Sequence, residues 1–291
     1  MKKYFLIPAA FLLTFSSCTE KINVNLPGSD KKIVIEGSIE NGKVAEVIIT
    51  RTIPLFSSVS GTASDLYVLD AKVYVSNGTI TDTLSLAIDS SSSLGVVYKG
   101  SAITGVIGQN YTLQVVAADG KTYNASTYIP TPVALDSVWW KQQPPQDTLG
   151  YANARLTDPS GLGNNYRWLA KRPKDRRFIA PIGATFDDKL IDGKSFDFAY
   201  TKGYDPTDNV NTPDADSDTE RDYYRKTDTI YIKFCAINRE SKDFYTTFEN
   251  AISNNGNPFA SPVTIIGNID NGALGVWCGV GATYDTIMPT P

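Results

Sequence analysis

The apolar and polar positions after residue 32 form short runs rich in β-branched and aromatic residues. In the run at 111–117, Tyr111, Leu113 and Val115 alternate with Thr112 and Gln114. A period of two is typical of a strand with one face in a core. The pattern therefore predicts strands in the first part of the chain at residues 33–39, 45–50, 72–75, 83–88, 96–98, 111–117 and 122–129.

Three dipeptides between these runs are turn signals: Asn41-Gly42, Asn77-Gly78 and Asp119-Gly120. Asn-Gly and Asp-Gly favour the two-residue turn of a β-hairpin because both central residues adopt positive φ. About seven short antiparallel strands in roughly 100 residues predict an immunoglobulin-like β-sandwich at 33–130. The prolines at 130 and 132 end the last strand, and we expect a domain boundary there.

The second half, residues 133–291, predicts a second β-rich domain with one short helix, so the fold class is mainly β. The helix is expected at 241–251, with Ser241 as its N-cap. Residues 172–226 carry charged and turn-forming residues, and we expect them to be a long polar insertion without regular structure. Strands are predicted at 135–140, 151–156, 166–171, 229–237, 263–266 and 275–280.

Residues 1–17 combine two lysines, a short apolar run and small residues before Cys18, which is the pattern of a lipoprotein signal peptide. We expect cleavage before Cys18 and acylation of this cysteine with palmitate-type chains. Residues 18–32 would then be a lipidated tether, and the lipid would be the membrane anchor. The alternative is an ordinary secretory signal with an incidental cysteine.

The net charge and the histidine content exclude several classes of function. Once Lys2 and Lys3 leave with the signal, 25 basic residues remain against 31 acidic ones, a formal charge of −6. A mildly acidic chain is a poor candidate for binding nucleic acid. The sequence contains no histidine, which removes Ser-His-Asp catalysis and His-ligated zinc. We therefore expect no cofactor and no enzymatic activity, with a carboxylate hydrolase as the remaining catalytic alternative.

Cys235 and Cys278 are left as a pair once Cys18 is acylated. An oxidising compartment permits a disulfide between them. In the predicted strand, Cys235 faces away from Ile232 and Phe234, whereas Cys278 shares a face with its own apolar neighbours. A bridge and two buried free thiols both stay open.

Asp214, Asp216 and Asp218 have the spacing that begins a calcium loop. The sixth position is Thr219, where such loops have glycine, and the twelfth is Arg225, where they have glutamate. A solvated acidic loop is the alternative. The aspartates at 187, 188 and 192 fit turn chemistry, because Asp accepts hydrogen bonds from nearby backbone amides.

Trp139 and Trp140 are adjacent in a predicted strand, so their side chains point to opposite faces. We expect one of them in the core and the other at a ligand, partner or domain contact.

Several segments together resemble the Bacteroidota lipoproteins classed as domain of unknown function 4249. The most specific stretch is Asn257-Pro258-Phe259-Ala260-Ser261-Pro262 followed by residues 267–276, Gly-Asn-Ile-Asp-Asn-Gly-Ala-Leu-Gly-Val. Weaker matches are Asp158-Pro159-Ser160-Gly161, Asn165-Tyr166-Arg167, Phe186-Asp187-Asp188, Asp192-Gly193 and Asp70-Ala71-Lys72-Val73.

The resemblance implies an outer-membrane lipoprotein, often encoded beside TonB-dependent transporters of the SusC type, and it implies no defined chemistry. Which face of the membrane the protein occupies stays open. Exported proteins of this phylum carry O-glycans at Asp-Ser/Thr-aliphatic triplets, which makes Thr83, Ser137, Thr148, Thr229 and Thr286 candidate glycosylation sites.

The expected function is thus a non-catalytic binding or accessory subunit of a TonB-dependent uptake system. A solitary glycan- or peptide-binding lipoprotein and a structural envelope protein are the alternatives.

Overall fold

An eleven-stranded sheet organises the computed structural model, which describes residues 31–53, 66–90, 92, 95–145, 147–203, 220–254, 261 and 263–288. The described residues are mainly β, with fifteen strands and one helix, as the sequence predicts. In sheet order the strands are β11 (Thr185–Asp187), β10 (Asn165–Lys171), β14 (Ile230–Ile237), β15 (Leu274–Ile287), β1 (Ile33–Glu40), β2 (Val44–Arg51), β5 (Val96–Thr104), β4 (Thr81–Ile88), β3 (Lys72–Ser76), β6 (Asn110–Val116) and β7 (Thr122–Tyr128).

The first half of the chain folds this sheet over itself at β4. The beginning of β4 pairs with β3 and its end pairs with β5. One layer is therefore β15-β1-β2-β5 and the other is β4-β3-β6-β7, which is the predicted sandwich. Turns lie at all three predicted dipeptides, and Gly42, Gly78 and Gly120 have positive φ. Their preceding residues do not, so the expectation of two-residue turns with positive φ at both central residues was wrong. Aliphatic side chains fill the core, among them Ile35, Val47, Val75 and Leu113.

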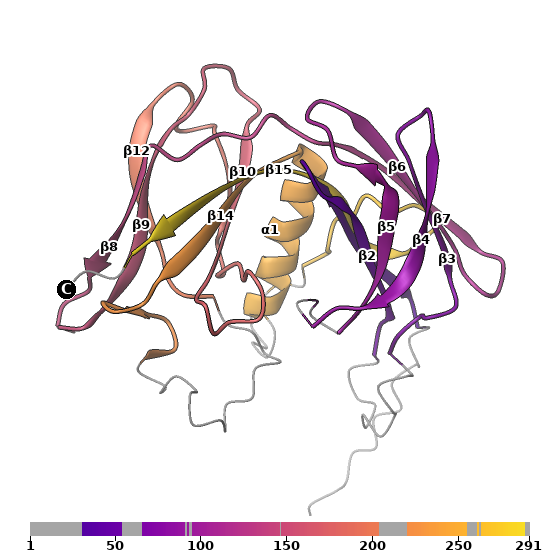
Figure 1. The fold of residues 1–291 in the computed structure, drawn as a ribbon, viewed down its shortest axis with the longest axis horizontal. Coiled ribbons are helices and arrows are strands. Elements are labelled where there is room, and N and C mark those ends of the chain that lie inside the picture. The colour runs from indigo at the N-terminus through magenta and orange to yellow at the C-terminus, as the bar shows by residue number, and fades with distance from the viewer. Residues whose placement is uncertain are drawn as a thin grey trace, which may run out of the picture. The chain divides into compact units, whose positions relative to one another are not determined.

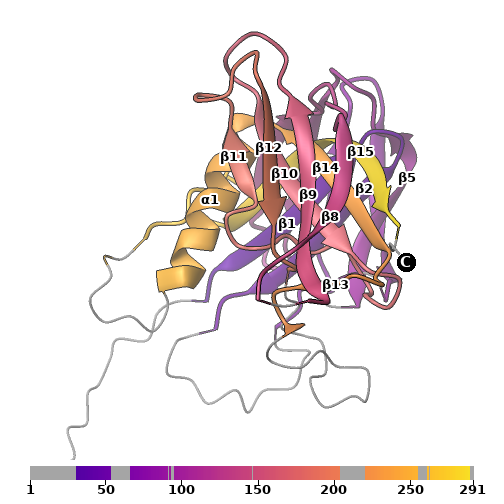
Figure 2. The ribbon, with the colours of Figure 1, turned by 90° about the vertical axis from the view of Figure 1, so that its left-hand side faces the viewer.

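The second half packs a smaller sheet against β10 and β14. In that sheet β9 (Leu149–Thr157) lies beside β12 (Ser195–Tyr200), β13 (Tyr224–Arg225) and β8 (Ser137–Gln142). Figure 2 shows β8, β9 and β12 in front of β10 and β14. The core between the two layers is rich in aromatic residues, including Tyr166, Trp168 and Phe234.

The long strand β15 belongs to both halves (Figure 1). Residues 274–280 pair in parallel with β1, and residues 280–287 pair with β14. Trp277 is buried in the first core, where its indole Nε1 donates to the Tyr111 carbonyl at 3.1 Å, and Ile287 is buried in the second. Residues 31–291 accordingly form one compact unit. The domain boundary expected at residues 130–132 stays a prediction.

A buried ionic group reinforces this junction. The carboxylate of Glu40, at the end of β1, accepts from Lys233 of β14 at 2.5 Å, from Lys43 at 2.9 Å and from the Tyr284 hydroxyl of β15 at 2.5 Å. Burial alone would raise the pKa of Glu40, but Lys233, Tyr284 and Lys43 together bring the pKa below its usual value. Glu40 is therefore held as a carboxylate between strands of both halves.

The helix α1 (Arg239–Asn254) covers the other face of β14 and β15. Its N-cap is Asn238, whose side-chain oxygen accepts from the Ser241 amide at 2.9 Å, so the prediction that Ser241 caps the helix was wrong. Ser241, Phe244 and Tyr245 form its buried face. Within the described residues, no helix has the length and apolar character needed to cross a membrane.

Residues 172–226 differ from the predicted insertion. Within the described parts, 172–203 and 220–226, they contribute β11, β12 and β13 and place Phe186, Phe198 and Tyr224 against the second core. The prediction of an irregular polar stretch was wrong there, because alternating aromatic residues in Ser-Phe-Asp-Phe-Ala-Tyr at 195–200 form an edge strand. Residues 204–219 lie outside the described residues.

Candidate functional site

A pocket of about 500 Å³ opens between the edge strands β11 and β12 and the helix α1. Side chains of β12 alternate, so Phe196, Phe198 and Tyr200 point into it while the residues between them are exposed. Phe186 of β11 and the turn residues Leu190 and Ile191 complete the apolar wall. We call this the aromatic pocket.

The rings of the aromatic pocket hold one another in fixed orientations. Phe196 and Phe198 lie 5.4 Å apart between ring centroids, and Phe186 lies 5.8 Å from Phe198, at 61°. The buried ring of Trp168 contacts Phe198 edge-on, with the ring centroids 5.7 Å apart. Tilted and edge-on pairs at these distances are favourable. The aromatic wall of the pocket is therefore preformed.

The opposite wall is the polar face of α1, with Lys242 and Thr246. The Thr246 hydroxyl oxygen is buried and has no hydrogen-bond partner among the described residues. Nearby, Glu249 accepts from the Gly183 amide at 2.9 Å and from the Thr185 hydroxyl at 3.2 Å. Burial raises the pKa of Glu249. A buried hydroxyl without a partner is uncommon in folded proteins and is satisfied when water or a ligand enters.

A second pocket of about 310 Å³ adjoins the first, and the two share Asp187 and Lys242. A chain of alternating charges crosses it, with nitrogen–oxygen distances of 3.0 Å for Lys189–Asp187, 3.2 Å for Asp187–Lys242, 3.5 Å for Lys242–Asp243 and 3.7 Å for Asp243–Arg239. Burial alone would raise the pKa of Asp187, but Lys189 and Lys242 bring the pKa below its usual value. We call this the ionic pocket.

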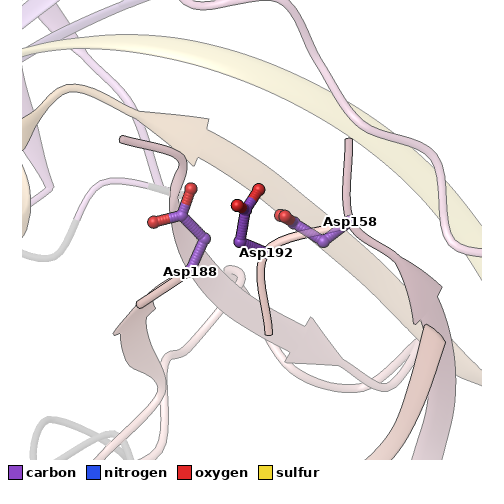
Figure 3. A group of neighbouring side chains, drawn as sticks. All are labelled: Asp158, Asp188 and Asp192. Atoms are coloured by element: carbon purple, nitrogen blue, oxygen red, sulfur yellow. The ribbon is translucent and has the colours of Figure 1, made fainter. Parts of the chain in front are cut away.

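Beside the ionic pocket, Asp158, Asp188 and Asp192 bring their carboxylate oxygens within 4.8 Å of one another (Figure 3). We call the three residues the Asp clasp. Asp188 accepts from the amides of Gly163 and Asn164, both at 2.8 Å.

The other two members of the Asp clasp also accept from the loops around them. Asp192 accepts from the Gly161 amide at 2.6 Å, and Asp158 accepts from the Tyr166 hydroxyl at 2.5 Å. Burial and the neighbouring Asp158 raise the pKa of Tyr166, so the tyrosine stays a donor.

The Asp clasp ties the loop after β9 to the turn after β11. Three carboxylates of this kind are ligands that a hard cation prefers, and no basic side chain of the described residues forms an ion pair with them. Every carboxylate nevertheless has backbone or hydroxyl donors, which agrees with the turn chemistry expected for Asp188 and Asp192. We assign the Asp clasp a structural role.

The two adjacent tryptophans, of which one was expected in the core and the other at a contact, lie away from both pockets. Trp140 packs on the second core, and its indole Nε1 donates to the Tyr224 carbonyl at 3.2 Å. Trp139 is half-buried on the opposite face of β8. Neither residue lines the aromatic or the ionic pocket. Sequence reasoning missed the aromatic residues of β12, although their alternation at 195–200 was the signal that could have found them.

Cys235 and Cys278 are free thiols, both buried beneath α1. Cys235 lies opposite Ala282, four residues along β15 from Cys278. Four residues of strand span about 13 Å, whereas a disulfide needs Cα atoms about 4.4–6.8 Å apart. The strand register therefore contradicts the candidate bridge, and the alternative of two buried thiols is the one seen. Burial raises the pKa of Cys235 to about 12, which keeps this thiol protonated and unreactive.

The remaining candidate sites lie partly outside and partly inside the described residues. Cys18 and the calcium candidate formed by Asp214, Asp216 and Asp218 lie outside the described residues. Among the glycosylation candidates, Thr83, Ser137, Thr148 and Thr286 are exposed and Thr229 is half-buried, so their modification stays a prediction.

The fold and the two pockets define the class of the protein: a mainly β protein of two joined sandwiches with a built pocket at the open edge of the second. A family model described as Domain of unknown function (DUF4249) matches residues 19–284, and the chain belongs to this family. Among curated proteins, no match is found.

Residues 257–260 and 262 lie outside the described residues, but other segments behind the family resemblance hold parts of the fold together. Residues 158–161 and 186–193 meet in the Asp clasp. Asn268 exchanges two hydrogen bonds of 2.8 Å with the backbone of Trp277, and Asp270 accepts from the Asn124 amide at 2.6 Å. These contacts hold loops and strands together and do not indicate a chemical activity.

Proposed function

We propose that this protein is a non-catalytic binding lipoprotein of the outer membrane that serves a TonB-dependent uptake system. The aromatic pocket carries the proposal. Ligand sites in proteins are concave, mostly apolar and about 300–1,000 Å³ in volume, with a few convergent polar groups. The aromatic pocket has this size and this mixture, with Lys242 and the unpartnered Thr246 hydroxyl opposite four aromatic rings.

The openness of the second sandwich supports a binding role over a purely structural one. Phe186, Phe196 and Phe198 are only partly buried, although a closed sandwich would cover them. Removing apolar surface from water stabilises a protein by about 25 cal/mol per Å², and the exposed parts of these rings do not contribute this free energy. A ligand that covers them recovers it.

Pocket binding can be tested with an apolar fluorescent probe, 1-anilinonaphthalene-8-sulfonate. The variant Thr246→Phe places a ring in the aromatic pocket, where there is room for it. The matched control is Thr112→Phe, the same change at an exposed position of β6. We expect Thr246→Phe to weaken probe binding at least tenfold, about 1.4 kcal/mol, and the control to bind as wild type. Equal binding by all three proteins would contradict a ligand role for this pocket.

The proposed membrane location and transporter partner must be tested in native cells. Wild type should fractionate with outer membranes and be recovered with a TonB-dependent transporter after gentle detergent extraction, whereas Cys18→Ala should leave the membrane fraction or stay unprocessed. Probe binding without transporter recovery would favour the solitary glycan- or peptide-binding lipoprotein. Absence of both would favour the structural envelope protein.

A further inference from the structure

The shared wall of the two pockets fixes what a ligand must look like. Asp187 and Lys242 line both pockets, so a group that fills the aromatic pocket has its polar end at these two side chains. Their carboxylate and ammonium lie 3.2 Å apart. A ligand that satisfies both must present a positive and a negative or carbonyl group next to an apolar one.

The charges of the ionic pocket are balanced. Three cations, Lys189, Lys242 and Arg239, face three carboxylates, Asp187, Asp188 and Asp243. The terminal cations Lys189 and Arg239 are 74% and 84% exposed and each is paired with one acid, so these pairs contribute little to stability and can exchange partners. A zwitterion can replace such pairs without leaving a charge unmatched, whereas a ligand with one charge cannot.

The charged groups around the ionic pocket favour one orientation of a bound zwitterion. Asp188 lines the ionic pocket and belongs to the Asp clasp, so two further carboxylates lie within 4.8 Å of its own. Arg239 and Lys242 lie in the first turn of α1 on the other side, where the helix dipole favours negative charge. An ammonium group is favoured toward Asp187, on the side of the Asp clasp, and a carbonyl or carboxylate toward Lys242 and Arg239.

The aromatic pocket then receives the side chain. Its rings stack best on another aromatic or large apolar group. The Thr246 hydroxyl, one helical turn after Lys242, is available to a ligand amide or carbonyl. We infer that the ligand is an α-amino compound with an aromatic side chain, either a free amino acid or the amino terminus of a short peptide. This inference rests on the proposed function and deepens it by naming the ligand class.

Isothermal titration of the full chain with four probes tests the inference: L-phenylalanine, Phe-Gly-Gly, N-acetyl-Phe-Gly-Gly and Gly-Gly-Gly. We expect about a tenfold loss of affinity when the aromatic side chain is absent and a similar loss when the ammonium is acetylated. L-phenylalanine binding as tightly as Phe-Gly-Gly identifies a free amino acid as the source, and tighter binding of the tripeptide identifies a peptide.

Variants separate the two pockets. Lys242→Met should weaken Phe-Gly-Gly about tenfold, and Lys72→Met, the same change at an exposed position of β3, should leave binding unchanged. Equal binding of the free and acetylated tripeptides, or no effect of Lys242→Met, overturns the inference. If the anilinonaphthalene probe binds in the aromatic pocket and no α-amino probe does, the ligand class is wrong while the proposed function stands. If neither kind of probe binds, both fail.

Discussion

The two sandwiches of this protein differ in how they are filled and closed. The first is packed mainly with aliphatic side chains, and contacts between β7 and β15 close it. The second is packed with aromatic rings and is left open where β11 and β12 lie at sheet edges. Branched aliphatic residues fill a closed interior without gaps, whereas rings that line an edge leave a shaped pocket. We therefore expect the first half to contribute most of the stability and the second half to carry the proposed binding surface.

The largest effect is expected when one ring is removed from each half. Trp277→Ala empties a fully buried site in the first core and should lower the free energy of unfolding by about 3–5 kcal/mol. Phe196→Ala removes a ring from the rim of the aromatic pocket and should cost about 1 kcal/mol or less, because the site is already open to solvent. Urea unfolding of both variants measures the difference. Equal losses would contradict the division of roles.

A smaller effect should arise at the junction between the halves. The pKa of Glu40 is lowered in the folded state, so its contribution to stability is present above the unfolded value near pH 4.3 and is lost as pH falls through the folded pKa. Glu40→Gln keeps a hydrogen-bond acceptor but removes the charge, and it should lose about 2 kcal/mol at pH 7. The stability of the variant should also fall less than that of wild type between about pH 5 and pH 3. Parallel pH profiles of the two proteins would show that Glu40 does not link the halves electrostatically.

The smallest expected effect concerns the thiols beneath α1. Because Cys235 and Cys278 are too far apart to bridge, adding a reductant should leave the midpoint of thermal unfolding unchanged, and Cys235→Ser with Cys278→Ala should respond in the same way. Thermal scans with and without dithiothreitol measure this. A drop of several degrees on reduction in wild type alone would indicate a disulfide and would contradict the register of β14 and β15.

Prediction from sequence worked best where local rules decide the structure. Alternation and the Asn-Gly and Asp-Gly turns located the strands of the first sandwich, because period and turn chemistry are local properties. The pairing of β1 with β15 could not be predicted in this way, since two strands far apart in sequence carry no mutual signal. The aromatic pocket was missed for a related reason: Phe186 and Phe198 come from a stretch whose charged residues hid its alternation.

The position of β15 has a consequence for how the protein is made. Val34 pairs with Leu274, a sequence separation of 240 residues. Until β15 has been synthesised, one edge of β1 therefore stays unpaired, and the first core lacks the indole of Trp277. Contacts between residues so far apart slow folding, and an unpaired edge is prone to wrong association in the meantime. Chaperones that shield strand edges should therefore raise the yield of this protein more than that of a sandwich closed by its own neighbouring strands.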